Sequence, residues 1–386
     1  MRRDTHSIIR QAAEWFLSKS GPLARIGRGI LLALWIVVLP LLAMVLLEGA
    51  SSLVLSIHTL RRPAEGMHSE YDSLLGWVNK PNVYLRDLYG PGTYLRTNAQ
   101  RFRSNQPVAG SVPNGRVRVI CSGDSFTLGY GVDNDHTWCE RLTAQDRRIE
   151  TVNMGQGGYG IDQAYLWYRR DGVPLEHNVH LFAFITDDFS RMKSPTFHGY
   201  GKPVLAIRNR ALTIENVPVP GREFYAPWLT RSADAIAQLR TSELIRRVAK
   251  RFRPAKTTNI PASDSLIWEI AAKVFAELNS INRAKNSVLV LVFLPTKGDR
   301  GEGAEAWRRR VHELSEREHI ALADLIGDFQ QVHADSVDRL FIPAGTIEFI
   351  GAEGHYTALG NAWVANKLYQ HLLTIPEIAS RLPQPK

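Results

Sequence analysis

The sequence predicts an α/β protein, in which a parallel sheet carries helices on both faces as a three-layer α/β/α sandwich. Short apolar runs rich in Val, Ile and Leu alternate with longer segments of helical periodicity. The strand-like runs cover 117–121, 149–153, 180–185, 287–293 and 320–325. The helix-like segments cover 138–146, 161–169, 265–283, 304–318 and 360–373. A separate apolar run near the N-terminus adds one predicted transmembrane helix.

That apolar run extends from Ile30 to Leu47 without a charged residue and would span about 27 Å as a helix. Uncharged residues continue beyond Glu48 to Ile57, so we expect the membrane anchor within 28–57. A cleaved signal peptide and a buried core helix are the alternative interpretations. Six basic residues precede the run against two acidic ones. The positive-inside rule then predicts a single pass through the inner membrane, with a cytoplasmic N-terminus and an extracytoplasmic remainder.

The expected domain organisation follows from these patterns. Residues 1–27 form a basic segment with an amphipathic stretch, and residues 58–114 form a β-rich preface or linker. The α/β domain covers 115–374, with an insertion at 194–262 and a tail at 375–386. Within the insertion, two β-like runs flank Asn209-Arg210, which predicts a hairpin.

Composition excludes several classes of function. Part of the formal net charge of +9 lies in residues 1–28, where it bears on the orientation in the membrane. The basic cluster at 246–256 predicts a solvated helix face or a contact with an anionic headgroup or acidic glycan. An extracytoplasmic location argues against nucleic acid as a partner. Two cysteines exclude a disulfide-dense scaffold and zinc fingers, and no histidine–carboxylate spacing suits a metal. The G-x-G-x-x-G match at 155–160 lacks the acidic residue of a dinucleotide site, so we expect neither cofactor nor metal.

Ser125 is the strongest candidate for a catalytic residue. It follows the first strand-like run in the tetrapeptide Gly123-Asp-Ser-Phe126, at the sheet edge where ligands bind in open α/β proteins. A serine nucleophile needs a histidine base and a group that orients the base. His355 and Glu353 can supply these roles. Taken singly, such a serine is more often a helix cap, and such a histidine a polar surface residue.

Four segments, in this order, strengthen the assignment. They are Gly123–Asp133, Asn153–Gly158, Thr186–Phe189 and His355–Gly360. Together they resemble the conserved blocks of the SGNH (GDSL-type) hydrolases over roughly 115–374. The resemblance implies a flavodoxin-like sheet, a serine esterase with Ser125 as nucleophile and His355 as base, and an oxyanion hole. Its donors would be the N–H groups of Ser125 and Gly158, with a third donor at Asp187 or Thr186.

Two positions depart from the family pattern. Asp187 stands where the family usually has an Asn that donates to the oxyanion. Either burial keeps this carboxyl protonated, or Thr186 or a backbone N–H replaces the missing donor. Ala352 stands where the commoner spacing has the acid of the triad. Glu353 resembles the spacing of the branch that acetylates or deacetylates extracellular polysaccharides, so we predict it as the acid.

The sequence therefore predicts an extracytoplasmic serine esterase or O-acyltransferase. Its expected substrate is an ester, in particular an acetyl ester, of an envelope or secreted polysaccharide. The expected partners are the acylated glycan, the membrane through the N-terminal helix, and an envelope polysaccharide-modifying complex. A lipid or small-ester hydrolase and a non-catalytic glycan-binding pseudoenzyme remain the alternatives.

Overall fold

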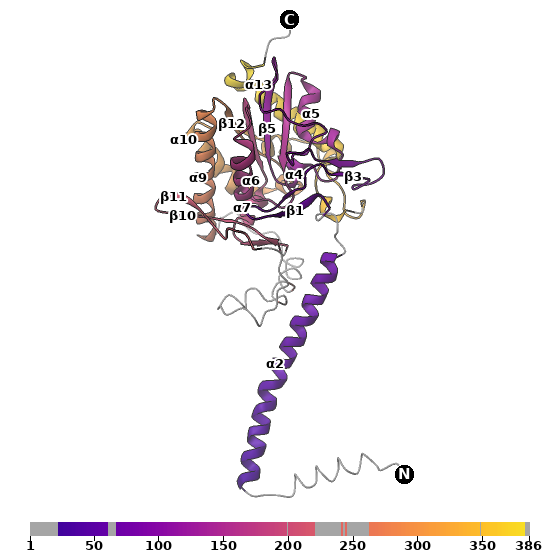
Figure 1. Ribbon diagram of the computed structural model, residues 1–386, viewed down its shortest axis with the longest axis vertical. Coiled ribbons are helices and arrows are strands. Elements are labelled where there is room, and N and C mark those ends of the chain that lie inside the picture. Colours follow the sequence, from indigo (N-terminus) through magenta and orange to yellow (C-terminus); the bar gives the residue numbers. More distant parts are fainter. Residues whose placement is uncertain are drawn as a thin grey trace. The chain divides into compact units, whose positions relative to one another are not determined.

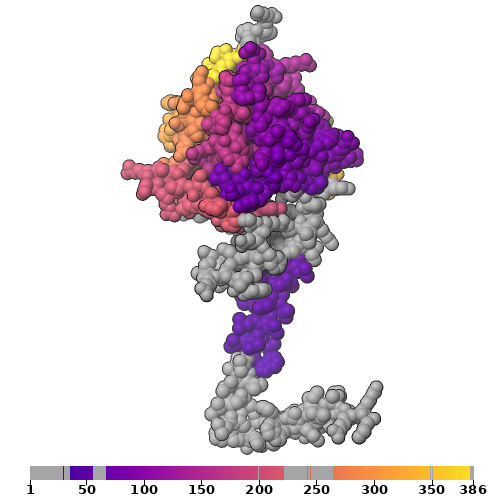
Figure 2. All heavy atoms as spheres, viewed as in Figure 1, coloured from indigo at the N-terminus to yellow at the C-terminus, as the bar shows by residue number. Residues whose placement is uncertain are grey.

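The computed structural model describes residues 22–60, 67–198, 200–220, 241, 244, 262–347 and 349–382 (Figure 1). The residues outside those ranges, together with several whose side chains are not described, are grey in Figure 2. They include the predicted amphipathic stretch and the basic cluster at 246–256. The chain divides into two compact units. The first contains α2 (Pro22–Leu60) with residues 241 and 244, and the second contains the other described residues.

The predicted apolar helix is present as α2. Its segment Trp35–Val54 has a mean hydropathy of 2.1 over 20 residues, a length of about 30 Å that matches the hydrocarbon core of a bilayer. The large apolar side chains there are exposed, Leu46 by 64%. Glu48 is the one carboxylate in the segment, and it accepts hydrogen bonds from the backbone N–H and hydroxyl of Thr241 at 3.0 and 2.9 Å. By length and composition the helix could be a membrane anchor or a signal sequence.

The central sheet of the second unit has five parallel strands. Their order is β13 (Ala321–Asp324), β12 (Val288–Phe293), β7 (Val179–Phe184), β5 (Val117–Gly123) and β6 (Ile149–Gly155). The chain starts at β5, moves to β6 at the edge and then crosses back to β7, which is the flavodoxin-like order of a doubly wound sheet. Each strand begins and ends within two residues of its predicted run.

Helices cover both faces of this sheet (Figure 1). One face carries α6 (Ile161–Trp167), α9 (Ala262–Ala284) and α10 (Glu305–Glu318); the other carries α5 (Trp138–Gln145), α11 (Leu325–Gln330) and α13 (Ala358–Thr374). Side chains alternate between the two cores along each strand, since Ile120 packs with the first set and Cys121 with the second. The predicted three-layer α/β/α sandwich is therefore confirmed. The structure also describes the helices α4 (Ser125–Leu128), α7 (Thr186–Arg191), α12 (Ala334–Leu340) and α14 (Pro376–Ala379).

Antiparallel hairpins flank the sheet. The preface contains β1 (Ser69–Asp72) with β2 (Gly76–Asn79), and β3 (Tyr84–Arg86) with β4 (Tyr94–Arg96). The insertion contains β8 (Thr196–Phe197) with β9 (Tyr200–Gly201), and β10 (Val204–Arg208) with β11 (Ala211–Glu215). Asn209 and Arg210 have φ of 50° and 64°, values that suit a two-residue hairpin turn of positive φ. The predicted hairpin is thus confirmed.

Candidate active site

Ser125 lies at the carboxyl end of β5, where the chain order switches direction in the sheet. Asp124 caps α4, because its carboxylate accepts a 2.9 Å hydrogen bond from the N–H of Phe126. Gly123 permits the sharp turn, since a Cβ there would lie 2.5 Å from the carbonyl oxygen of Ala183. The strand end, the small residue and the cap together present the hydroxyl of Ser125 at the sheet edge.

The structure brings His355 to Ser125, as the sequence predicts. Its Nε2 lies 2.7 Å from the Ser125 Oγ, across 230 positions of sequence. Two backbone hydrogen bonds to Ile342 hold the loop that carries His355. Ile342 donates to the His355 carbonyl at 2.8 Å, and Gly354 donates to the Ile342 carbonyl at 2.9 Å. This distance and these supports suit a hydroxyl nucleophile and its base.

Aromatic rings and a nearby cation set the properties of His355. The Phe126 ring stacks on the imidazole at a centroid distance of 4.4 Å, and Tyr130 lies at 5.4 Å. Burial, followed by the positive charge of Arg191, lowers the pKa of His355 to about 4. The imidazole is therefore neutral at neutral pH, which is the state a general base requires.

Glu353 does not occupy the position predicted for it. Its Oε1 accepts a 2.8 Å hydrogen bond from the N–H of Gly345, and no hydrogen bond joins this carboxylate to His355 among the described residues. The backbone groups of Glu353 and Ala352 act on the imidazole instead, and they oppose the lowering of the His355 pKa. The Nδ1 of His355 is buried and finds no hydrogen-bond partner in the described part of the chain. Ala352 places a methyl group where the commoner family spacing has a carboxylate. The structure thus differs from the predicted triad, and it brings together a Ser–His pair.

Of the predicted oxyanion donors, Gly158 has a suitable backbone conformation, whereas the side chains of Asp187 and Thr186 do not supply a donor. Gly158 follows β6 with φ +76°, a conformation that favours glycine, and a Cβ there would meet the ring of Phe197. Asp187 is exposed at the start of α7, so the burial that would keep its carboxyl protonated is absent. Thr186 directs its hydroxyl to Asp299 at 3.3 Å. Neither residue therefore shows the third donor that the sequence predicts.

Arg191 is the residue of this site that the sequence did not reveal. Its Nη1 donates to Asp124 at 3.1 Å, to the carbonyl of Tyr159 at 2.7 Å and to Asp188 at 2.5 Å. Burial raises the pKa of both Asp124 and Asp188. The only sequence signal was the spacing of Asp188 and Arg191 by three positions on one short helix, which is common for surface pairs. Within the described residues, no group of three acidic, histidine or cysteine side chains could hold a metal ion.

Comparisons with known proteins add the following. No family model matches the sequence, and no curated protein matches it significantly. Among solved structures, a member of the lipolytic protein G-D-S-L family from Veillonella parvula DSM 2008 is 12% identical and covers 67% of this chain and 100% of its own, with a TM-score of 0.38. An acetyl xylan esterase is 14% identical, over 66% of this chain and 98% of its own, with a TM-score of 0.39. A lipase/acylhydrolase from Enterococcus faecalis is 11% identical, over 70% and 99%, with a TM-score of 0.37. At these identities and scores, the chemistry must be inferred from the side chains of this chain.

The low pKa of His355 predicts the pH dependence of the site. A base with a pKa of about 4 stays neutral as the pH falls, so labelling of Ser125 by a fluorophosphonate should decline only below about pH 4. Substitution of Arg191 by Gln removes one cause of the lowered pKa and should move this limb to higher pH. The exposed Arg169 provides the control, since Arg169→Gln should leave the pH at which labelling declines unchanged. A wild-type limb near the ordinary histidine pKa of about 6.5 would contradict the assignment.

The placement of Glu353 predicts a mild phenotype for its removal. Glu353→Ala should change kcat/KM for an activated acetate ester by less than about threefold, because the carboxylate contacts Gly345 rather than His355. His355→Ala should reduce it by about a thousandfold or more. A loss of similar size in Glu353→Ala, with an unchanged melting temperature, would show instead that the carboxylate moves to Nδ1 during the reaction.

Proposed function

We propose that this chain is a serine esterase or O-acyltransferase of the SGNH type that forms an acyl-enzyme on Ser125. The 2.7 Å contact between Ser125 Oγ and His355 Nε2 at the end of β5 carries the proposal. Nε2 takes the hydroxyl proton while Oγ bonds to the ester carbonyl carbon. The ester C–O bond then breaks, and the alcohol leaves with the proton from His355. Water or a sugar hydroxyl attacks the acyl-enzyme in a second, equivalent step.

The oxyanion would be held by the backbone N–H groups of Ser125 and Gly158. Each such donor contributes about 3 kcal/mol to transition-state stabilisation in other acyl-transfer enzymes. The exposed Asp187 adds no donor when it is ionised, so this site would work with a smaller oxyanion hole than the family pattern implies. We expect slower turnover as the consequence.

A small cavity supports an acetyl group as the acyl part. A space of about 20 Å³ is lined by residues that include Trp77, Tyr130, Gly157 and Phe197. Neither Ser125 nor His355 lines this cavity. It adjoins them through Gly157, which precedes the proposed oxyanion residue, and through Tyr130, which lies beside His355. A volume of this size holds about one water-sized group, such as a methyl group. A long acyl chain would need the aromatic side chains to move, which disfavours the lipid hydrolase alternative.

The apolar helix α2 supports a proposal on the location and on the natural substrate. We infer that α2 crosses the inner membrane with its N-terminus in the cytoplasm and holds the second unit outside. The acyl acceptor or donor would then be an envelope or secreted polysaccharide, and a polysaccharide-modifying complex would be the partner. The orphaned Nδ1 of His355 favours one competing function, a glycan-binding pseudoenzyme without turnover.

Covalent labelling tests the proposed nucleophile. The full chain in detergent should form one fluorophosphonate adduct at Ser125, because the neutral His355 can take its proton. Ser125→Ala should abolish the adduct, whereas Ser190→Ala, at an exposed serine of α7, should leave it intact. Peptide mass mapping locates the adduct. The absence of any adduct in a folded protein would favour the pseudoenzyme.

The size of the cavity predicts selectivity for short acyl groups. The value of kcat/KM should fall by about tenfold or more from p-nitrophenyl acetate to the butyrate, since two added methylene groups exceed the space available. Phe197→Ala should enlarge the cavity and raise activity on butyrate relative to acetate. Tyr71→Ala, at an exposed tyrosine outside the cavity lining, serves as the control. Equal use of octanoate and acetate would support the lipid hydrolase instead.

A further inference from the structure

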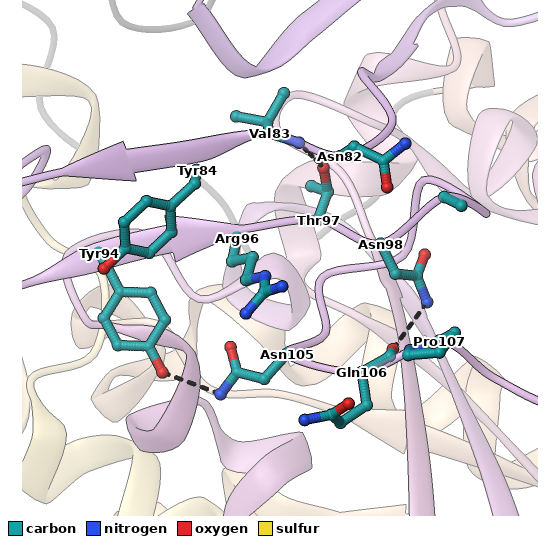
Figure 3. A pocket seen from close by; sticks show the side chains of 11 residues that line it. Asn82, Val83, Tyr84, Tyr94, Arg96, Thr97, Asn98, Asn105, Gln106 and Pro107 are labelled. Atoms are coloured by element: carbon teal, nitrogen blue, oxygen red, sulfur yellow. Dashed lines mark hydrogen bonds between the residues drawn. The ribbon is translucent and has the colours of Figure 1, made fainter.

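An open groove of about 760 Å³ lies on the preface, on residues other than those of the candidate active site. Its lining comes from the hairpin of β3 and β4 and from the segments that follow, and it includes Tyr84, Tyr94, Arg96, Asn105 and Gln106 (Figure 3). This volume falls within the range of small-molecule sites. The sequence resemblance assigns no role to this surface.

The groove presents two aromatic rings on one wall. The rings of Tyr84 and Tyr94 lie 5.7 Å apart, and Figure 3 shows them side by side on neighbouring strands. Tyr84 is 52% exposed, and the guanidinium of Arg86 lies 5.6 Å from the centroid of its ring. The Tyr94 hydroxyl donates to Asp135 at 2.8 Å and accepts from Asn105 at 2.8 Å, which fixes its ring. The two ring planes are tilted by 47° to each other, so each ring offers its own apolar face with a polar edge.

Unused hydrogen-bonding groups complete the lining. Figure 3 shows Arg96 extending toward Asn105 and Gln106. Arg96, Gln106 and Asn82 are exposed, and none of their side chains has a hydrogen-bond or ion-pair partner among the described residues. A guanidinium without a carboxylate partner is a ready bidentate site for an anion. The amides add donors and acceptors on the same surface.

The floor of the groove is held rigidly. Asn134 accepts from the backbone N–H of Arg96 at 3.1 Å, donates to the Arg96 carbonyl at 2.9 Å and donates to Asn105 at 3.0 Å. The hydroxyl of Thr97 accepts from Val83 and donates to the Lys80 carbonyl at 2.6 Å. Because these bonds fix the backbone before any ligand arrives, binding needs to order only the exposed side chains of the lining.

We propose that this groove is an accessory binding site for a uronate-containing oligosaccharide chain. The C–H face of a pyranose ring packs on the Tyr84 and Tyr94 rings, a uronate carboxylate pairs with Arg96, and ring hydroxyls meet the amides of Asn82 and Gln106. The polar lining does not suit an acyl chain. A nucleic acid strand, with one charge per nucleotide, would need a row of cations. Among the described residues the groove offers Arg96, with Arg86 over the Tyr84 ring, and the carboxylate of Asp135 lies beside Tyr94.

Binding can be measured apart from catalysis. The full chain carrying Ser125→Ala, in detergent, is titrated by calorimetry with hexasaccharides of galacturonate, mannuronate and hyaluronan, and with neutral maltohexaose. We expect one acidic hexasaccharide to bind at least about tenfold more tightly than maltohexaose, because one charge-assisted pair provides this difference. Since Ser125 is absent, the result does not depend on the proposed esterase activity.

Variants of the groove identify the site of binding. Arg96→Gln should weaken the acidic hexasaccharide about tenfold and remove the preference over maltohexaose. Tyr84→Ala should weaken both sugars, whereas the exposed controls Arg317→Gln and Tyr71→Ala should change neither. Melting temperatures report on folding. The proposal is overturned if no acidic hexasaccharide binds at millimolar concentration, if Arg96→Gln and Tyr84→Ala bind like the parent, or if single-stranded RNA binds the groove more tightly than every hexasaccharide.

Discussion

The guanidinium of Arg191 is the contact on which the assembly of the site depends, because it joins loops that follow three different strands. It bonds to Asp124 after β5, to the Tyr159 carbonyl after β6 and to Asp188 after β7. Because all three groups bond to one buried cation, the turn that carries Ser125 and the glycine-rich segment 155–160 are held at a fixed distance from each other. Removal of the cation would leave two buried carboxylates facing each other, and breaking a buried ion pair in this way costs about 3–5 kcal/mol.

After burial, the same cation is the second cause of the lowered pKa of His355. In a Ser–His–acid triad, a carboxylate at Nδ1 stabilises the imidazolium that forms when the base takes a proton. Here Nδ1 has no hydrogen-bond partner among the described residues, and Arg191 further disfavours the positive charge. The base is therefore available over a wide pH range, but its driving force for proton transfer is small. Stacking on Phe126, rather than a carboxylate, keeps its ring in place.

The sequence predicted the place of those site residues that stand at strand ends or within a recognisable motif. Parallel strands end at one edge of the sheet, so Ser125 and Gly158 could be placed there from periodicity and the motif alone, and His355 followed from its block. Glu353 and Asp187 could not be placed, because the first depends on the conformation of a loop and the second on which side of a short helix faces solvent. Glu353 meets a backbone N–H eight positions upstream, at Gly345, and Asp187 begins a helix on its exposed side. The pairing of Arg191 with Asp124 joins positions 67 apart, which no local pattern indicates.

The two recognition surfaces that we propose have opposite physical requirements. Selection of a small acyl group needs an apolar space of limited size, for which we propose the cavity lined by Trp77, Tyr130 and Phe197. A polar polymer needs an open groove that keeps its groups hydrated. Arg103 connects them, because its guanidinium donates to the carbonyls of Leu128 and Val132 and to the Asn134 side chain. Leu128 ends the helix that begins at Ser125, and Asn134 supports the groove floor. The buried Arg103 thus fixes the groove to the nucleophile, so a chain held in the groove would keep a constant register with Ser125.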